Sequence, residues 1–477
     1  MGSKNTIKGS SQNLNRRKFI GTAAAAAAIP GLFLEKSALA AESGNPLAFS
    51  ENAREIPIRD EVDVIVCGGG PAGIAVAITA ARAGASVRLF EIHGCLGGTW
   101  TSGLLTWIFD LDKPGIAKEI REKLDERGAR RGTDKDNFVY EPDEMKLLLE
   151  DLFVEAGVRL RLMTQVVAAY KEKNRLTTII TESKSGREAW RAKVFIDATG
   201  DGDLGALSGC KWDIGRPGDG LCQPLTMNAL AVVSDVTQLQ KYICFYGSDQ
   251  SWRGEPNKNF KAEVRRAGIE PSYNVAKLFH IRDNIVLMMV NHEYGVKPYD
   301  ADAMTAATIH GRREVFNIAK GLRSLGGVWD GLQVVASAEQ IGIREGRRIH
   351  GLYTISEKDI TEGATFEDGI ARVNFGVDIH SLVKEGNKNE GYSKIISKPY
   401  EIPLRALIAK DVDGLMMAGR CISGDFIAHS SYRVTGNAVA MGEAAGVVAT
   451  IASTSNRLPN EVLWSEAEAK LKQIGQR

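Results

Sequence analysis

The sequence contains few cysteines and none of the spacings typical of metal sites. Its six cysteines form no C-x-x-C pair, which argues against both a disulfide-rich scaffold and a zinc site. None of the seven histidines belongs to an H-E-x-x-H pattern, so no metal centre is predicted. Internal repeats are absent from the sequence as well.

A strong charge of either sign is also missing. The chain has 60 basic and 59 acidic residues, and the first forty residues contain six of the basic ones. Nothing in this balance suggests a nucleic-acid partner. The composition is typical of a soluble globular protein, and the length of 477 residues predicts two domains or one domain with large insertions.

The N-terminus has the three parts of an export signal in order. Asn15 to Ile20 reads NRRKFI, a twin-arginine pattern, Ala23 to Leu34 is mildly apolar, and Ala38 to Ala40 is a small-residue cleavage site. These features predict a signal peptide over 1–40, a linker over 41–58, and export by the twin-arginine machinery to the periplasm or another extracytoplasmic site. The apolar stretch is too short and too poor in large apolar residues for a membrane span. The alternative is a disordered basic tail followed by an Ala-rich helix.

The stretch VIVCGGGPAG, from Val64 to Gly73, has the pattern of a dinucleotide-binding turn. Gly68, Gly70 and Gly73 form G-x-G-x-x-G after a β-branched apolar run. The first glycine permits a tight turn, the second lets the backbone approach a pyrophosphate, and the third allows close helix–strand packing. The Ala-rich helix that follows would direct its N-terminal amides at the phosphates. Glu91 ends the next predicted strand, where an acidic residue binds ribose hydroxyls.

The sequence shows one nucleotide-binding unit, and the export signal favours FAD over NAD as the nucleotide bound there. No second G-x-G-x-x-G unit is visible, which argues against reductases that hold two nucleotides. A tightly bound FAD can be loaded before a folded protein is exported, whereas free NAD is not expected outside the cytoplasm. The pattern therefore predicts a Rossmann-like FAD-binding fold.

Three further segments are expected to approach this cofactor. They are EIHGCLGGTWTSG over 91–103, VFIDATGDGD over 194–203 and GLMMAGR over 414–420, and a small-residue helix over 436–449 would direct its N-terminus at the flavin. The predicted cofactor-binding residues are Gly68, Gly70, Pro71, Ala72, Gly73, Glu91, Gly97, Gly98, Thr99, Ala198, Thr199, Gly200, Asp201, Gly419, Arg420 and Asn437.

The expected fold class is α/β, with a parallel sheet and helices in the FAD-binding domain and an inserted mixed α+β substrate domain. The FAD-binding domain would occupy 59–210 and, with the C-terminal helix, 386–477, while the substrate or cap domain would occupy 211–385, which lacks glycine turns of this kind. Helical spacing is found over 116–127, 142–156 and 460–475, and strand-like runs over 158–170, 176–182, 284–290 and 414–420.

The chain resembles the FAD-dependent oxidoreductases of the glutathione-reductase-like flavoprotein superfamily. It looks most like an often exported subgroup with IGIRE-x-RRI and AGR-x-IS motifs, which here are Ile341 to Ile349 and Ala418 to Ser423. The resemblance implies non-covalently bound FAD and hydride chemistry at the flavin N5. The spacing from His93 to Gly97 differs from the histidine attachment motif of succinate dehydrogenases, and the sequence does not decide whether the flavin is covalently linked.

Two segments supply catalytic candidates. FIAHSSYRVT precedes the helix expected to face the flavin, and we predict His429 as general base or acid, assisted by Tyr432, with Arg433 binding an anionic group or the flavin. The alternative is that His429 is a hydrogen-bonded loop histidine. The second segment is IGIREGRRI. It is expected to begin as an apolar strand and to place the charged cluster from Arg344 to Arg348 near the cofactor, with Arg344 as the candidate site residue. A salt-bridge turn between domains explains this segment equally well.

The sequence predicts an exported FAD-dependent dehydrogenase or oxidase. It would remove hydride from a CH–OH carbon of a small, polar, sugar-like molecule and pass electrons to a separate acceptor, a quinone, a cytochrome or oxygen. The alternative suggested by the arginines is fumarate-reductase-like reduction of an unsaturated carboxylate. A non-enzymatic flavin-binding redox module is the third hypothesis. His292, in NHEYG, faces the substrate cavity or has a structural position in the core or at the surface.

Overall fold

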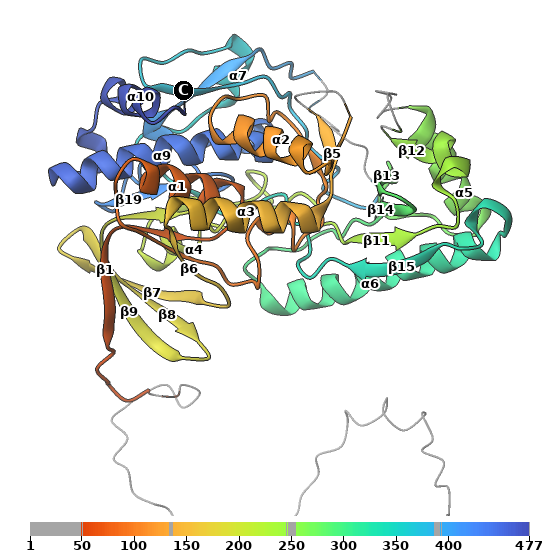
Figure 1. Cartoon of the computed structure of the whole chain (residues 1–477), viewed down its shortest axis with the longest axis horizontal. Coiled ribbons are helices and arrows are strands. Elements are labelled where there is room, and N and C mark those ends of the chain that lie inside the picture. The colour runs from red at the N-terminus through yellow and green to blue at the C-terminus, as the bar shows by residue number, and fades with distance from the viewer. Residues whose placement is uncertain are drawn as a thin grey trace, which may run out of the picture. The chain divides into compact units, whose positions relative to one another are not determined.

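The computed structural model describes residues 49, 51–132, 137–244, 246, 254–385, 392 and 394–476 (Figure 1). The predicted signal peptide over 1–40 lies outside the described residues, so it stays a prediction. The chain divides into two units, Met1–Glu55 and Ile56–Arg477. The architecture described below is that of the second unit.

The main sheet has a parallel half and an antiparallel half that meet at one long strand. The parallel half is β6 (Arg159–Arg161), β2 (Val87–Phe90), β1 (Ile58–Cys67), β9 (Gly186–Asp197) and β19 (Leu415–Met417). The first half of β9 also pairs antiparallel with β8 (Arg175–Ser183), and β8 pairs with β7 (Gln165–Glu172). The long strand β9 thus joins the nucleotide-binding half of the sheet to a twisted extension.

Two small-residue helices pack against each other so closely that their backbones are in contact. They are α1 (Pro71–Arg82) and α9 (Thr435–Ser455), which lie next to each other in Figure 1. A Cβ atom added to Gly442 would lie 2.3 Å from the Ala72 carbonyl oxygen, and one added to Gly446 would lie 2.6 Å from that of Val76. Glycine at both positions therefore lets the two helix backbones touch.

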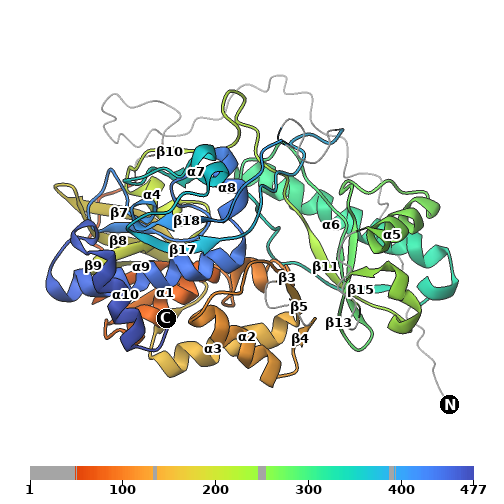
Figure 2. The same ribbon diagram turned by 90° about the horizontal axis from the view of Figure 1, so that it is seen from above.

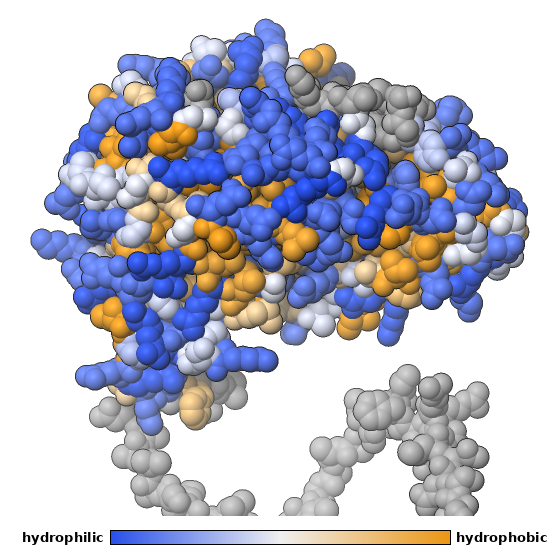
Figure 3. Space-filling model, in the orientation of Figure 1, coloured by the Kyte–Doolittle hydropathy of each residue, from blue (hydrophilic) through white to orange (hydrophobic). Residues whose placement is uncertain are grey.

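Helix α9 is long and apolar enough to cross a membrane, but 83% of its apolar window is buried inside the protein. It is the core helix between α1 and α10 (Trp464–Gln473). On the face shown in Figure 3, hydrophilic residues cover most of the surface and hydrophobic residues form smaller patches among them. The hydropathy of α9 thus reflects burial in the core.

A second sheet has a core of its own. Its strand order is β12 (Ile243–Cys244), β13 (Lys277–Arg282), β14 (Ile285–Met289), β11 (Asn228–Val232) and β15 (Gln333–Ser337). Helices α5 (Glu255–Arg266) and α6 (Ala301–Ser324) flank it, as Figure 2 shows on the right. Phe279, Met288 and Trp329 are fully buried in this core, which also takes in Trp107 from the first half of the chain.

The second core ends earlier in the sequence than the predicted inserted domain. The buried apolar residues from Ile349 to Leu382 belong to the core of the main sheet. This part of the chain contains the short helix α7 (Glu357–Glu362) and the strand β17 (Gly369–Val373), which pairs antiparallel with β18 (Tyr400–Pro403). The mixed α+β insertion is therefore present, and its predicted limits at 211 and 385 stay a prediction.

The expected helices at 116–127, 142–156 and 460–475 are confirmed as α2 (Ile116–Glu126), α3 (Pro142–Ala156) and α10. The strand-like runs at 176–182, 284–290 and 414–420 are confirmed as β8, β14 and β19.

Two expectations of local structure were wrong, and one of the alternatives is excluded. The strand expected over 158–170 is broken into β6 and β7, because Met163 has a left-handed backbone conformation with φ of 53°. The segment before Arg344 makes a single bridge from Gly342 to Thr226 instead of a strand. The segment around His429 is a helix, α8 (Phe426–Tyr432), because the Asp425 carboxylate accepts a hydrogen bond from the Ala428 amide and caps it.

All six cysteines are buried and unpaired, and burial raises the pKa of Cys210, Cys222 and Cys244 to about 12. Because the thiolate is the reactive form, we expect the native protein to react negligibly with an aromatic disulfide reagent at neutral pH. After unfolding in denaturant, all six thiols should titrate at once. Labelling of the native protein as fast as that of the unfolded protein would contradict this arrangement.

Candidate active site

A cavity of about 430 Å³ runs from the glycine turn of the main sheet to the second sheet. Its volume is in the range of small-molecule sites. One part of its wall comes from the carboxyl ends of β1 and β9 and the N-termini of α1 and α9. The other part comes from β11, β13 and β14 and from segments around Arg344, His380 and Arg433.

The glycine turn forms a cradle for an anionic group. Helix α1 begins at Pro71 after Gly70, with no side-chain cap, and both residues line the cavity. A Cβ atom added to Gly70 would meet nothing within 4 Å, so this backbone is open to a ligand. Free amides at a helix N-terminus favour phosphate groups. Gly68 has φ of +102°, and its Cβ would lie 2.5 Å from the Ala198 carbonyl oxygen, so only glycine fits there.

Glu91 lies beside this cradle in a fixed orientation. Its Oε2 accepts a hydrogen bond from the Gly69 amide at 2.5 Å, and its Oε1 accepts one from the His93 amide at 2.8 Å. The carboxylate is buried and lines the cavity. Because each carboxylate oxygen has two lone pairs, Glu91 can also accept hydrogen bonds from ribose hydroxyls.

The opposite wall of the cradle contains a guanidinium group with an unused donor. Arg420 Nη2 lies 3.0 Å from Asp201 Oδ1, while its Nη1 is buried with no hydrogen-bond partner among the described residues. Burial raises the pKa of Asp201, and the charge of Arg420 opposes this shift. A buried donor facing a cavity indicates an acceptor in the ligand. This cradle therefore fits the diphosphate and ribose of FAD.

Most of the predicted cofactor-binding residues line the cavity. These are Gly68, Gly70, Pro71, Ala72, Glu91, Gly98, Thr99, Ala198, Thr199, Gly200, Asp201, Gly419 and Arg420.

Gly73, Gly97 and Asn437 do not line it. Gly73 packs against the turn itself, and its Cβ would lie 1.9 Å from the Gly68 carbonyl oxygen. Gly97 has φ of +103° and makes room for the Thr101 side chain. Asn437 is fully buried in the first turn of α9, and neither polar atom of its side chain has a partner among the described residues.

The far part of the cavity, which we name the substrate end, combines aromatic and charged side chains. Its members are Trp107, Phe109, Asn228, Tyr273, Lys277, Arg344, Phe375, Asp378, His380 and Arg433. The sequence analysis singled out the two arginines and missed the others.

Arg344 is a protonated cation at this end at neutral pH. Its Nη1 donates hydrogen bonds to the Pro224 carbonyl oxygen at 2.7 Å and to Thr226 Oγ1 at 2.6 Å. Burial lowers the pKa of the Arg344 guanidinium to about 10, which leaves it charged at pH 7. The predicted placement of Arg344 near a ligand is in keeping with this geometry.

Arg433 lies across from an acidic residue. Its Nη2 donates to the Asp378 carbonyl oxygen at 2.9 Å and lies 3.4 Å from Asp378 Oδ2. The same carboxylate oxygen is 3.3 Å from Nε2 of His380. Burial lowers the pKa of Arg433, while the Asp378 carboxylate opposes this shift. Asp378 thus orients a cation and an imidazole at once.

The IGIREGRRI segment divides its charges between the cavity and the core. Arg348 Nη1 donates to Glu345 Oε1 at 2.5 Å, and this fully buried pair is tied to the Gly215 and Gly424 carbonyl oxygens. Arg347 donates to Asp203 Oδ1 at 2.8 Å. The cavity is thus lined by Arg344, while Arg347 and Arg348 form ion pairs away from it.

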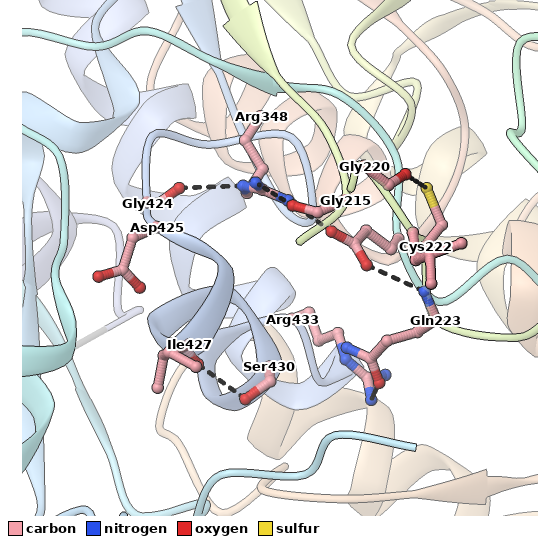
Figure 4. Close-up of polar contacts among 12 residues, drawn as sticks. Gly215, Gly220, Cys222, Gln223, Arg348, Gly424, Asp425, Ile427, Ser430 and Arg433 are labelled. Carbon is pink, nitrogen blue, oxygen red and sulfur yellow. Dashed lines mark hydrogen bonds and ion pairs between the residues drawn. The ribbon is translucent and has the colours of Figure 1, made fainter. Parts of the chain in front are cut away.

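Gln223 links this buried pair to the substrate end, as Figure 4 shows. Its backbone amide donates to Glu345 Oε2 at 3.0 Å, and its side-chain Oε1 accepts from Arg433 Nη2 at 3.3 Å and from the His380 backbone amide at 3.0 Å. One side chain therefore holds both Arg433 and the backbone of His380 in place.

The structure does not bring His429 and Tyr432 to the cavity. Both are fully buried on α8 and absent from the cavity wall, and their rings pack edge to face at 5.5 Å. Burial, with repulsion from Arg348, Arg433 and Arg420, holds the pKa of His429 well below its usual range. Burial likewise raises the pKa of Tyr432 well above its usual range. The expected acid–base role of these two residues therefore finds no support in the geometry.

His292 lies behind the wall. It is 4% exposed, and its ring stacks on that of Tyr273 with centroids 4.0 Å apart. It contacts the substrate end through Tyr273 and does not line the cavity.

The sequence contains a signal that could have identified Lys277 as a residue of the substrate end. Lys277 interrupts the apolar run VAKLFHI, and a charged residue in a predicted buried strand marks either an error or a functional position.

Parts of the chain are similar to characterised proteins. Over 152 residues the chain is 30% identical to the thiamine thiazole synthase of Pyrococcus horikoshii, covering 30% of this chain and 58% of that protein. It is 26% identical over 224 residues to digeranylgeranylglycerophospholipid reductase 2 of Methanopyrus kandleri, covering 44% of this chain and 57% of that protein. The chain thus spans less than two thirds of the length of these relatives.

Among solved structures, a geranylgeranyl bacteriochlorophyll reductase-like protein from Thermoplasma acidophilum matches 87% of this chain and 84% of its own, with 15% identity and a TM-score of 0.47. A flavin-dependent brominase matches 87% of this chain and 83% of its own, with 13% identity and a TM-score of 0.45. The sequence profile described as FAD dependent oxidoreductase matches residues 63–471, almost the whole described unit. This protein therefore belongs to the FAD-dependent oxidoreductase family, and its cofactor is FAD.

Proposed function

We propose that this enzyme removes hydride from a CH–OH carbon of a small substrate that also carries an anionic group, such as a hydroxy acid or a sugar acid. The observation that carries the proposal is the charge of the substrate end. Lys277, Arg344 and Arg433 line it, against Asp378 as its acidic side chain.

The excess of cations favours an anion over a neutral sugar. Arg344 makes no ion pair among the described residues, and its hydrogen bonds there all come from Nη1. Cations in a buried site attract an anionic ligand more strongly than cations in water do, because the local dielectric is low. A neutral polyol would leave this charge uncompensated. The sugar-like substrate expected from the sequence thus becomes an acidic one.

The other groups at this end suit the remainder of such a molecule. Asn228 Nδ2 donates to the Gly103 carbonyl oxygen, while its Oδ1 is buried with no partner among the described residues and can accept from a substrate hydroxyl. Trp107, Phe109 and Phe375 form an apolar wall that excludes water. When bound, FAD supplies the two-electron acceptor for hydride.

The test is an anaerobic titration of the FAD-loaded protein with matched pairs of donors. Gluconate is compared with glucose, and lactate with propane-1,2-diol, while the absorbance of oxidised flavin is recorded. We expect the acid of a pair to bleach the flavin, and the neutral partner to bleach it at much higher concentration or not at all. Equal bleaching by both partners would remove the case for an anionic substrate.

The same cations favour a second candidate, the reduction of an unsaturated carboxylate. In that case no donor bleaches the flavin, and dithionite-reduced protein is reoxidised by fumarate or a related enoate in the absence of oxygen. Protein that responds to neither donors nor enoates would fit the non-enzymatic redox module. A separate electron acceptor, a quinone, a cytochrome or oxygen, remains part of the proposal, as does export.

A further inference from the structure

The substrate end contains a tyrosine and a lysine joined by a hydrogen bond. Lys277 is the first residue of β13 and Tyr273 lies four residues before it, and both line the cavity. Lys277 Nζ is 2.9 Å from the Tyr273 hydroxyl oxygen. Tyr273 is 4% and Lys277 is 7% exposed, so the pair is largely removed from solvent.

The lysine has an unusual environment for a buried charge. Its described contacts are the Tyr273 hydroxyl and the faces of the Trp107 and Tyr273 rings, each 5.1 Å from the ammonium nitrogen. No carboxylate of the described chain forms an ion pair with it. A buried ammonium is costly unless an oxygen compensates it, so the phenolic oxygen is its main partner inside the protein.

Other charged groups around Tyr273 are mostly positive. Arg344 and Arg433 interact with it electrostatically, and both act across the cavity. His292 stacks on its ring at 4.0 Å, and the His380 ring is 5.8 Å away. Two carboxylates oppose these cations. Asp378 is shared between Arg433 and His380. Glu314 accepts hydrogen bonds from the amide and hydroxyl of Ser272, the residue before Tyr273.

Cations that surround a phenol stabilise its phenolate relative to its neutral form. We infer that Tyr273 is the catalytic residue that takes the proton of the substrate hydroxyl, and that Lys277 is a positioning residue that stabilises the phenolate. The inference rests on the proposed function. Tyr273 takes the place of His429 as the proton acceptor, because His429 is buried on α8 and does not line the cavity.

In the proposed reaction the substrate loses one proton and one hydride. The substrate O–H bond breaks and its proton goes to the phenolate oxygen of Tyr273. The electron pair of that bond forms the C=O bond, and the C–H bond breaks with its electron pair leaving as hydride. When bound, FAD would supply the two-electron oxidant that this hydride requires.

The experiment uses Tyr273→Phe, Lys277→Met and Lys277→Arg in the FAD-loaded protein, with Tyr242→Phe as control. Tyr242 is buried in the same core and does not line the cavity. We expect Tyr273→Phe to slow flavin bleaching ~10²–10⁴-fold, the usual contribution of a general base, with little change in substrate binding. Lys277→Met should slow bleaching and move the acidic limb of the pH profile to higher pH, and Lys277→Arg should restore part of the rate. Tyr242→Phe should behave as wild type.

A second readout does not depend on turnover. The tyrosines are titrated in the protein by the ultraviolet absorbance of tyrosinate. We expect Tyr273→Phe to lose the phenol that ionises first and Lys277→Met to delay its ionisation. Wild-type bleaching rates in Tyr273→Phe, or an unchanged first ionisation in both variants, would overturn the inference. If no donor bleaches the wild type, the proposed function fails, while the titration still decides whether the pair exists.

Discussion

Gly73→Ala should yield protein that lacks FAD and unfolds at a much lower temperature, whereas Gly70→Ala should yield folded protein with weakened FAD binding. The two positions are three residues apart in the same turn. A Cβ at position 73 would lie 1.9 Å from the Gly68 carbonyl oxygen. The backbone of Gly68 cannot move away easily, because it packs closely against the backbone of Ala198. Overpacking against backbone typically costs ~1–3 kcal/mol and sometimes more.

Gly70 provides the matched control within the same motif. Its φ of −74° is ordinary for alanine, and a Cβ there would meet no protein atom within 4 Å. The methyl group would instead occupy the cavity at the start of α1, where we place the diphosphate. The measurements are the flavin-to-protein absorbance ratio after purification, FAD binding to the apoprotein, and thermal unfolding of each apoprotein. Tight FAD binding by Gly70→Ala, or wild-type unfolding of Gly73→Ala, would contradict the cradle described above.

Arg344→Gln should weaken binding of the acidic substrate about 10- to 100-fold, because a hydrogen bond to a charged group is worth ~1.5–3 kcal/mol. FAD content should not change, since the described contacts of Arg344 are with Pro224 and Thr226 and not with the glycine turn. Arg344→Lys should recover part of the affinity. Arg265→Gln is the charge-matched control. It also removes one positive charge, from α5, and breaks only an exposed ion pair between Arg265 and Glu270.

The pH dependence of the same interaction gives an independent check. The pKa of Arg344 is about 10, so the cation persists through neutral pH and is lost as the pH rises through that value. Substrate affinity should therefore decline more steeply above pH 10 in the wild type than in Arg344→Gln. Binding is read from the perturbation of the oxidised flavin spectrum by a non-reactive carboxylate. Equal affinities of both proteins at pH 7 would place the anion elsewhere.

The sequence was most informative where a function depends on consecutive residues. The turn from Gly68 to Gly73 needs a strand before it, a helix after it and glycines at fixed positions, and all of these are local properties. The role predicted for the third glycine, close packing, agrees with the contact of Gly73 on Gly68. The same holds for Glu91, which directly follows β2 and accepts a hydrogen bond from the Gly69 amide of the turn.

Residues at the substrate end were harder to predict because they come together from distant segments. Tyr273 and Lys277 belong to the second sheet, His380 follows β17, and Trp107 lies in the first quarter of the chain. No periodicity connects such positions. His429 shows the opposite error, since it is close in sequence to Arg433 and to α9, yet the helical turn of α8 directs its ring into the core.

The apolar character of α9 bears on the export route that we propose from the N-terminal sequence. A machinery that threads an unfolded chain would encounter 21 residues, from Thr435 to Ser455, with the length and hydropathy of a stop-transfer sequence. In the folded protein the same residues are enclosed between α1 and the sheet, with glycines at the contact. Transport of the folded, FAD-loaded protein would conceal this segment from the bilayer, and threading would expose it.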